Sequence, residues 1–398
     1  MVIEDVRYRI VFDSRGRETV ECEVESDGVV GRASAPSGAS TGSDEAVVLS
    51  PRRYKEIEEK VSKALIGLSV FEQEEVDSAL RALDGTENFS NIGGNFAVSA
   101  SIAVAKCASE ILGIPLCQYL AGAFARELPY PLGNVIGGGK HAEGSTSIQE
   151  FLVIPAGAKS FLEAQRTNAE VHRQIREEMR LRGIFCAKGD EGAWAAQISD
   201  ETAFEILCRA VEKVESETGV DVRIGIDFAA SELWDGNYYV YGDKKLDREG
   251  NLEYVARLVE EYDLLYIEDP FHENDFESFA ELTKRVKCMV CGDDIFVTNV
   301  KRLKRGIELR AGNTLLVKPN QVGTLTETLR AVRLAKENGF SVVVSHRSGE
   351  TEDSYLSHLA VAFNAKLIKT GVVGGERISK LNEMLRIEEL LRAKMVRI

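Results

Sequence analysis

Carboxylates that could hold a metal ion follow three short apolar runs in the second half of the chain. Asp227 comes after VRIGI, Glu268 after LLYI and Asp293 after MVCG. Oxygen ligands without histidine or cysteine suit a hard divalent cation such as Mg²⁺ or Mn²⁺, with water and substrate completing the coordination. The three carboxylates therefore predict a magnesium site.

Basic residues follow the next three apolar runs: Lys318 after TLLV, His346 after SVVVS and Lys369 after KLI. We expect Lys318, partly desolvated beside a metal ion and other cations, to have a lowered pKa and to act as a base near neutral pH. Arg347 and Ser348, together with Lys369, suit a doubly anionic substrate. Metal, base and anion clamp together describe the abstraction of a proton next to a carboxylate.

These six positions must be brought together by the elements that carry them. A β-branched run of this kind is typical of a buried parallel strand, and each interval leaves room for a loop, a helix and the next strand. One strand that ends in a charge usually just meets solvent. Six in series indicate a (β/α)8 barrel, in which the carboxyl ends of the strands gather at one mouth where catalysis takes place.

Two further segments belong to the predicted barrel. The run PLGNVIGGGKHAEG opens from a short strand into glycines and then His141. In QEFLVIP the polar residues Gln149 and Glu150 precede the apolar run instead of following it. Either Glu150 lies at the opposite, stabilising face of the barrel or this strand runs backwards, and the pattern alone leaves both open.

Two loops carry candidate residues with little apolar support. The acidic, glycine-rich segment KGDEGAWAA presents Glu191. The segment PSGASTGSDE (36–45), which contains Ser40, consists of small and hydroxyl-bearing residues. Such a segment can be a mobile loop that closes on an oxyanion or a metal, or an ordinary flexible linker.

The N-terminal part has a different organisation. Alternating residues at 3–11, 18–26 and 29–35 predict a three-stranded meander, and helical periodicity dominates from about 52 to 122. Pro129 and Pro131 mark the change of pattern. We therefore expect an N-terminal α+β domain over 1–127 and a catalytic barrel domain over 128–398.

Composition restricts the partners and the compartment. Of the 398 residues 44% are hydrophobic, enough for a sizeable core, and the net charge of −15 argues against nucleic acid or an anionic membrane as partner. No apolar run is expected to span a membrane, and the N-terminus lacks the layout of a signal peptide. Seven scattered cysteines favour reduced thiols and a cytoplasmic location, with the Cys288 and Cys291 pair packed in the core.

Motifs along nearly the whole chain resemble the enolase family, the phosphopyruvate hydratases. The most specific are SGASTG (37–42) and SHRSGETED (345–353), whereas IEDP and GDD are shared with a wider set of barrel dehydratases. The resemblance implies a barrel whose second strand is antiparallel, which would place Gln149 and Glu150 at the active mouth. It also implies the conversion of 2-phosphoglycerate to phosphoenolpyruvate and water.

The resemblance further implies a role for each matching residue. Lys318 would take the C2 proton, and Glu191, supported by Glu150, would protonate the departing C3 hydroxyl. Of two Mg²⁺ ions, with Mn²⁺ able to substitute, the second would bind Ser40 and the phosphate when the loop closes. The remaining assignments are Asp227, Glu268 and Asp293 to the first Mg²⁺ and the substrate carboxylate beside it, Lys369 to that carboxylate, Arg347 and Ser348 to the phosphate, and His141, Gln149 and His346 to the pocket lining.

Some positions depart from the family pattern. Asp44 stands where an aromatic residue or histidine is usual, Phe89 replaces a common lysine, GDEGAWAA lacks a glycine and a proline, and KTGVVGGER is one residue short. These departures leave two alternatives to an enolase. One is a Mg²⁺-dependent dehydratase of the same superfamily that acts on another phospho- or sugar acid, and the other is a non-enzymatic binding protein. A homodimer is expected.

Overall fold

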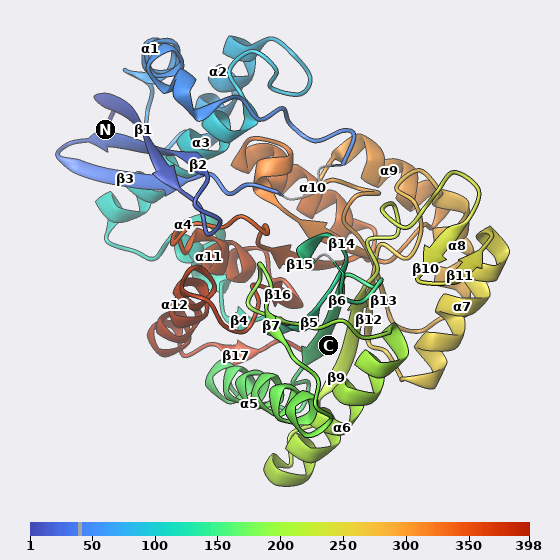
Figure 1. Ribbon diagram of the computed structural model, residues 1–398. Helices are drawn as coiled ribbons and strands as arrows, with labels where there is room; N and C mark the ends of the chain where they lie inside the picture. Colours follow the sequence, from blue (N-terminus) through green and yellow to red (C-terminus); the bar gives the residue numbers. More distant parts are fainter. Residues whose placement is uncertain (39–41, 143) are drawn as a thin grey trace.

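The computed structural model of the chain describes residues 1–38, 42–142 and 144–398. Ser40, the residue expected to bind a second metal ion, lies outside the described residues. The chain forms an N-terminal sheet with helices and then a closed barrel surrounded by helices (Figure 1).

The N-terminal sheet is the predicted meander. Strands β1 (Asp5–Phe12), β2 (Glu18–Ser26) and β3 (Val29–Ser34) pair antiparallel in that order. Helices α1 (Tyr54–Leu65), α2 (Gln73–Asp84), α3 (Gly94–Leu112) and α4 (Leu116–Ala121) follow. Helix α3 lies so close to β3 that a Cβ on Gly31 would sit 2.1 Å from the carbonyl oxygen of Ala103, which is why a glycine is needed there.

Helix α3 corrects one expectation from the sequence. By length and composition it could cross a membrane, contrary to the expectation that no run would reach that length. In the folded chain 78% of its apolar window is buried, against the sheet on one side and neighbouring helices on the other. Its composition therefore reflects a core helix that is covered on most sides.

Eight strands close the barrel, in the order β5, β6, β9, β12, β13, β14, β15 and β16, with β16 pairing back to β5. Strand β6 is antiparallel to both of its neighbours, β5 and β9, as the family resemblance implied. The reversed direction puts Gln149 and Glu150 at the same mouth as the carboxyl ends of the other strands. The bounds are β5 (Tyr130–Gly137), β6 (Glu150–Ile154), β9 (Arg223–Asp227), β12 (Tyr266–Glu268), β13 (Met289–Gly292), β14 (Thr314–Val317), β15 (Ser341–Ser345) and β16 (Leu367–Lys369).

Helices surround the barrel, and short strands decorate it. The helices are α5 (Phe161–Leu181), α6 (Asp200–Thr218), α7 (Arg248–Glu261), α8 (Phe276–Arg285), α9 (Val300–Leu309), α10 (Leu325–Glu337), α11 (Tyr355–Ala362) and α12 (Gly375–Leu391). The additional strands are β4 (Glu127–Leu128) paired with β17 (Lys394–Met395), β7 (Ala187–Lys188) with β8 (Trp194–Ala195), and β10 (Tyr239–Tyr241) with β11 (Lys244–Leu246). The division of the chain at 127 stays a prediction.

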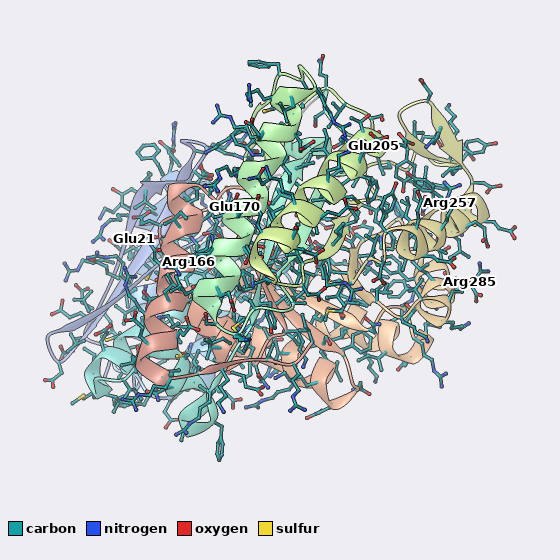
Figure 2. All side chains as sticks on the ribbon, turned by 90° about the horizontal axis from the view of Figure 1, so that it is seen from below. Glu21, Arg166, Glu170, Glu205, Arg257 and Arg285 are labelled. Carbon is teal, nitrogen blue, oxygen red and sulfur yellow. The ribbon has the colours of Figure 1, made fainter. Side chains whose placement is uncertain are left out.

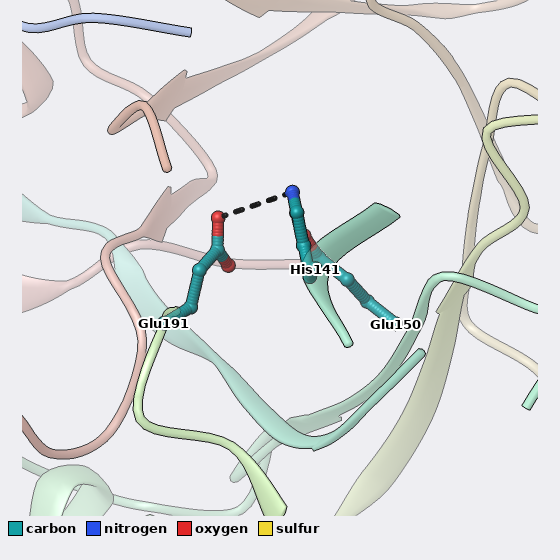
Figure 3. Close-up of side chains that lie close together, drawn as sticks. All are labelled: His141, Glu150 and Glu191. Carbon is teal, nitrogen blue, oxygen red and sulfur yellow. Dashed lines mark ion pairs between the residues drawn. The ribbon is translucent and has the colours of Figure 1, made fainter. Parts of the chain in front are cut away.

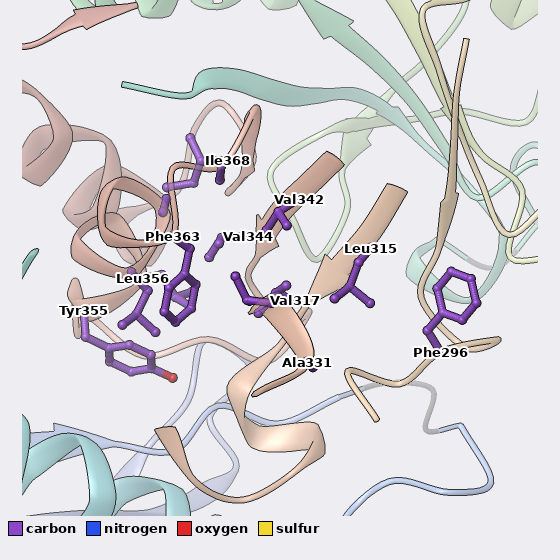
Figure 4. Packing of buried hydrophobic residues seen from close by; sticks show 14 of the residues in the cluster. Phe296, Leu315, Val317, Ala331, Val342, Val344, Tyr355, Leu356, Phe363 and Ile368 are labelled. Atoms are coloured by element: carbon purple, nitrogen blue, oxygen red, sulfur yellow. The ribbon is translucent and has the colours of Figure 1, made fainter. Parts of the chain in front are cut away.

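Both faces of the barrel strands are apolar because both are covered. Outward-facing residues such as Val317, Val344 and Ile368 pack with Leu356 and Phe363 of the surrounding layer (Figure 4). The residues between them face inward and fill the barrel, namely Leu132, Leu152, Tyr266, Cys291, Leu316, Val343 and Leu367. This filled interior forms the floor beneath the mouth.

Charged side chains cover the outside of the helical layer. Arg166 and Glu205 are exposed on α5 and α6, and Arg257 and Arg285 are exposed on α7 and α8 (Figure 2). Helices of this layer are amphipathic because they have a polar outer face and an apolar inner face, whereas the strands inside are apolar on both faces.

Candidate active site

The predicted site residues gather at one mouth of the barrel, around a cavity of about 30 Å³. Strand ends supply most of them, the β7–β8 turn supplies Glu191, and the short helix η3 (Gly139–His141) supplies His141. The lining comprises His141, Gln149, Glu150, Glu191, Asp227, Asp293, Lys318, Ser345, His346, Arg347, Ser348 and Lys369. Glu268 lies at the same level but does not line the cavity.

Lys369 is held by a ring of carboxylates. Its Nζ lies 3.0 Å from Glu150 Oε2, 3.0 Å from Asp227 Oδ2 and 2.8 Å from Glu268 Oε2. Strand register places these acids side by side, because Asp227 pairs with Glu150 on β6 and with Glu268 on β12. The carboxylates raise the pKa of Lys369 well above its ordinary value despite its burial. Lys369 is therefore a permanently charged cation.

Negative charge is crowded at this point even with Lys369 present. Burial, and then repulsion by Asp227, raises the pKa of Glu268 to about 7. The hydroxyl of Tyr266, two residues earlier on the same face of β12, donates to Glu268 Oε2. A cluster in which a carboxylate resists ionisation would be stabilised by further positive charge.

Lys318 has a simpler environment than Lys369. Its Nζ forms an ion pair with Asp293 Oδ2, while Gln321 Nε2 donates to Asp293 Oδ1 over 2.8 Å. Burial alone would lower the pKa of Lys318, but the Asp293 carboxylate outweighs burial and raises it. The lowered pKa expected of Lys318 beside a bound metal ion stays a prediction.

The donor chemistry of Asp227, Glu268 and Asp293 fits a hard divalent cation, since all three offer carboxylate oxygen at buried or half-buried positions. Each of them contacts one of the two lysines, and the three do not form one compact group of ligand atoms. Among the described residues, carboxylate or imidazole ligand atoms come within 4.8 Å of one another in two other sets: His141, Glu150 and Glu191, and Asp269, Asp293 and Asp294.

Glu150 also lies close to another acid at the mouth, Glu191. Glu150 and Glu191 are both buried, and His141 lies between them, with Nδ1 3.4 Å from Glu150 Oε1 and Nε2 3.9 Å from Glu191 Oε1 (Figure 3). Burial, and then the charge of Glu191, raises the pKa of Glu150 well above its ordinary value. Glu150 is thus the member of the pair that is harder to ionise.

Two side chains face Glu191 from its other side. His346 Nε2 lies 3.2 Å from Glu191 Oε2, and Asn134 Nδ2 donates to the same oxygen over 3.2 Å. Burial raises the pKa of Glu191, but His346 and His141 outweigh it and bring the pKa below its ordinary value. Burial lowers the pKa of His346 itself to about 3, so His346 is neutral at neutral pH.

Arg347 connects the mouth to the end of the 36–45 segment. Its Nη1 lies 2.8 Å from Glu45 Oε2, and Glu45 also accepts from Gly42 N (3.1 Å) and Gln321 Nε2 (3.3 Å). A pocket of about 1180 Å³ opens beside the Arg347–Glu45 pair, and Glu45 and Gln321 are among the residues that line it. The catalytic candidates line the small cavity instead, so we place the chemistry there.

Sequence reasoning missed four residues that shape the mouth: Glu45, Gln321, Arg377 and Lys380. Gln321 bridges Glu45 and Asp293, and Lys380 Nζ lies 2.5 Å from Glu350 Oε2. Gln321 lies in the KPNQVGTL motif directly after Lys318, which was the available signal. Arg377 and Lys380 lie on α12, where cations ordinarily indicate an exposed face.

Comparison with known proteins covers the whole chain. A family model described as "Enolase, N-terminal domain" matches residues 3–120, and one described as "Enolase, C-terminal TIM barrel domain" matches residues 125–396. An enolase of Archaeoglobus fulgidus is 72% identical over 100% of both chains. Enolases of Halobacterium salinarum (53% identical, 97% of this chain and 99% of the relative) and Methanothermobacter thermautotrophicus (49%, 98% and 96%) are also similar.

Proposed function

The chain belongs to the enolase family, and we infer from this membership that it catalyses the reversible dehydration of 2-phosphoglycerate to phosphoenolpyruvate in glycolysis and gluconeogenesis. It is a carbon–oxygen lyase. The observation that carries the inference is identity of 72% over the full length of an enolase, which leaves no part of the fold unmatched. The family depends on magnesium.

We assign the proton at C2 of the substrate to Lys318 and the C3 hydroxyl to Glu191. The two groups lie on different elements of one cavity, so they can face different atoms of one small substrate. The ion pair with Asp293 opposes loss of the Lys318 proton. Any cation that engages the Asp293 carboxylate would weaken this pair and favour the base form of Lys318. Glu150, whose pKa is raised, would support Glu191.

We assign Asp227, Glu268 and Asp293 to the first of two Mg²⁺ ions, with Mn²⁺ able to substitute. When bound, Mg²⁺ would neutralise the substrate carboxylate as negative charge accumulates on it. Ser40 would contribute to the second ion. Lys369 would face the same carboxylate, Arg347 and Ser348 the phosphate, and His141, Gln149 and His346 would line the closed pocket. The buried charges at one mouth support these assignments.

Absorbance in the ultraviolet tests the activity directly, because the enol product absorbs and 2-phosphoglycerate does not. We expect a rise in absorbance with Mg²⁺ and none without it. Turnover of a sugar acid with no turnover of 2-phosphoglycerate would instead identify a related dehydratase.

We also propose a homodimer, from the family resemblance. We propose a cytoplasmic location from the same resemblance and from the reduced cysteines. Light scattering on the purified protein would test the first: a mass of twice 43.8 kDa is expected.

A further inference from the structure

Helix α12 inserts two cations beneath the catalytic loop after β15. Arg377 and Lys380 are both completely buried, although cations seldom are. Arg377 Nη1 donates to the carbonyl of Arg347 over 2.7 Å, and Nη2 donates to the carbonyl of Ser348 over 2.7 Å. The carbonyl of Asp190, next to Glu191, lies 3.4 Å from Nη2. One guanidinium therefore joins the two loops that carry the predicted phosphate ligands and the predicted acid.

The turn before α12 is shaped for this contact. Gly371 has φ +71°, and a Cβ there would lie 3.0 Å from the carbonyl oxygen of Glu191 and 3.4 Å from Arg377 Cγ. Gly192 has φ +78°, and a Cβ there would lie 2.3 Å from the carbonyl oxygen of Val373. The short KTGVVGGER segment thus packs tightly against the Glu191 turn and delivers Arg377 to the space between the loops.

Arg377 also touches the imidazole of His346. Its Nη1 lies 2.8 Å from His346 Nδ1. A guanidinium has only N–H donors and stays charged, so the nitrogen it faces must accept. Nδ1 therefore carries no proton, and a neutral ring has its proton on Nε2. That nitrogen lies 3.2 Å from Glu191 Oε2, so its N–H faces the carboxyl group without forming a hydrogen bond to it.

We propose that Arg377 is a positioning residue that fixes His346 as the neutral tautomer with its proton on Nε2, and so aims an N–H donor at Glu191. The proposal deepens the proposed function, on which the role of Glu191 rests. A neutral N–H faces the Glu191 carboxyl without setting a cation against it. An imidazolium there would make Glu191 a poorer acid, because an adjacent positive charge favours the carboxylate.

The charged groups around His346 agree with this assignment. Arg377 from α12 and Lys369 from β16 disfavour a proton on the ring, as does burial, whereas Glu191 favours one. The net direction is a lowered pKa for His346. The ring is also confined, because its side chain is only 1% exposed.

The ring nitrogens can be observed directly by ¹⁵N NMR of protein labelled at histidine. The chain has five histidines, and a His346→Gln variant assigns the signals of this one. We expect the shift of an unprotonated nitrogen at Nδ1 and of a protonated nitrogen at Nε2, unchanged between about pH 5 and pH 8. His172 is the internal reference, because its Nε2 lies 2.9 Å from the carbonyl oxygen of Gly192 and must also carry the proton. A proton on Nδ1 of His346 would overturn the proposal.

Variants of α12 separate positioning from simple support of the fold. In Arg377→Met we expect His346 to titrate between pH 5 and pH 8 and kcat to fall on the order of 10–100-fold, as is typical when a supporting hydrogen bond to a functional imidazole is lost. KM should change little. Lys380→Met removes the other buried cation, which contacts Glu350 and the carbonyl of Thr351 but not His346, and should keep the tautomer. An unchanged tautomer in Arg377→Met would contradict the proposal.

Because the NMR signals do not depend on turnover, the two ideas fail separately. The expected tautomer in a protein that does not dehydrate 2-phosphoglycerate would remove the proposed function and leave the role of Arg377 toward His346. A proton on Nδ1 in an active enzyme would do the reverse.

Discussion

Lys318 and Lys369 follow strands β14 and β16 at the same mouth, yet their surroundings differ. Lys369 contacts three carboxylates on three strands, and only 4% of its side chain is exposed. Lys318 contacts one carboxylate, that of Asp293, and 14% of its side chain is exposed. The Asp293 carboxylate has a second donor in Gln321, so it is not left alone when the lysine moves.

This difference in surroundings gives the two lysines different roles. A cation with three partners costs too much to deprotonate and serves as a fixed charge. A cation whose single partner can bind something else is able to become a base. Identical residue types in equivalent positions of one barrel thus acquire different roles from the number of their neighbours.

Removal of Mg²⁺ by chelation should have the largest effect on activity of all the changes considered. Without Mg²⁺ we expect no measurable dehydration, because the carboxylates and lysines would stay paired with each other and the substrate carboxylate would keep its full charge. Activity should be followed by ultraviolet absorbance after exhaustive treatment with EDTA and again after Mg²⁺ is restored. Full turnover in the chelated protein would remove the metal assignment.

Lys318→Ala should stop exchange of the C2 proton with deuterated water as well as product formation. General bases typically contribute about 10²–10⁴-fold to the rate. Substrate affinity must be measured alongside, because the variant also changes the charge of the pocket. Persistent exchange with normal binding would mean that another residue is the base.

Glu191→Gln should block dehydration while C2 exchange remains detectable, because Lys318 and the anion-binding groups are unchanged. The loss of product formation should again be about 10²–10⁴-fold. Isotope exchange and product formation measured on the same sample make the comparison. Loss of both in equal proportion would show that the two proton transfers are not assigned to separate groups.

Lys369→Met should destabilise the protein more than Lys318→Met. Removing one partner of a buried ion pair costs about 3–5 kcal/mol, and Lys369 leaves Glu150, Asp227 and Glu268 without their shared cation. Urea denaturation of both variants in EDTA gives the two free energies of unfolding. Equal losses would contradict the contrast between the lysines.

His172 should make stability depend on pH behind the Glu191 turn. Burial lowers its pKa from 6.5 to about 4, so below pH 6.5 the unfolded chain binds a proton that the folded chain does not. The free energy of unfolding should therefore fall as pH decreases from 6.5 to about 4, by up to about 3 kcal/mol. His172→Gln should show a shallower decline in denaturation series at several pH values. A decline as steep as that of the parent would exclude this residue as the cause.

The sequence carried much of the site because strand ends are a local pattern. A run such as SVVVS followed by His346 indicates both the buried strand and the position of the side chain at its end. The family motifs added the antiparallel direction of β6, which the polar residues Gln149 and Glu150 suggested without deciding.

The rest depended on contacts between distant segments. Nothing near Lys318 in the sequence indicates that Asp293 is its partner, so this ion pair could not be predicted. Arg377 and Lys380 look like the polar face of an ordinary helix, and only the folded chain shows that the face is buried. Phe89 replaces a usual lysine, and the structure shows it fully buried with the Arg81 guanidinium 4.0 Å from its ring centroid.

Closure of the barrel determines when the chain can complete its fold during synthesis on the ribosome. Strand β16 pairs with β5, with Lys369 opposite Leu132, although more than half of the chain separates them. Strand β5 is synthesised early and cannot pair with β16 until that strand has also been made. Pairing between strands so far apart in the sequence is slow. Until then the carboxylates of β6, β9 and β12 have no lysine to share, and the nascent chain carries their unbalanced charge. Catalysis thus cannot begin before the segment that carries β16 has been synthesised.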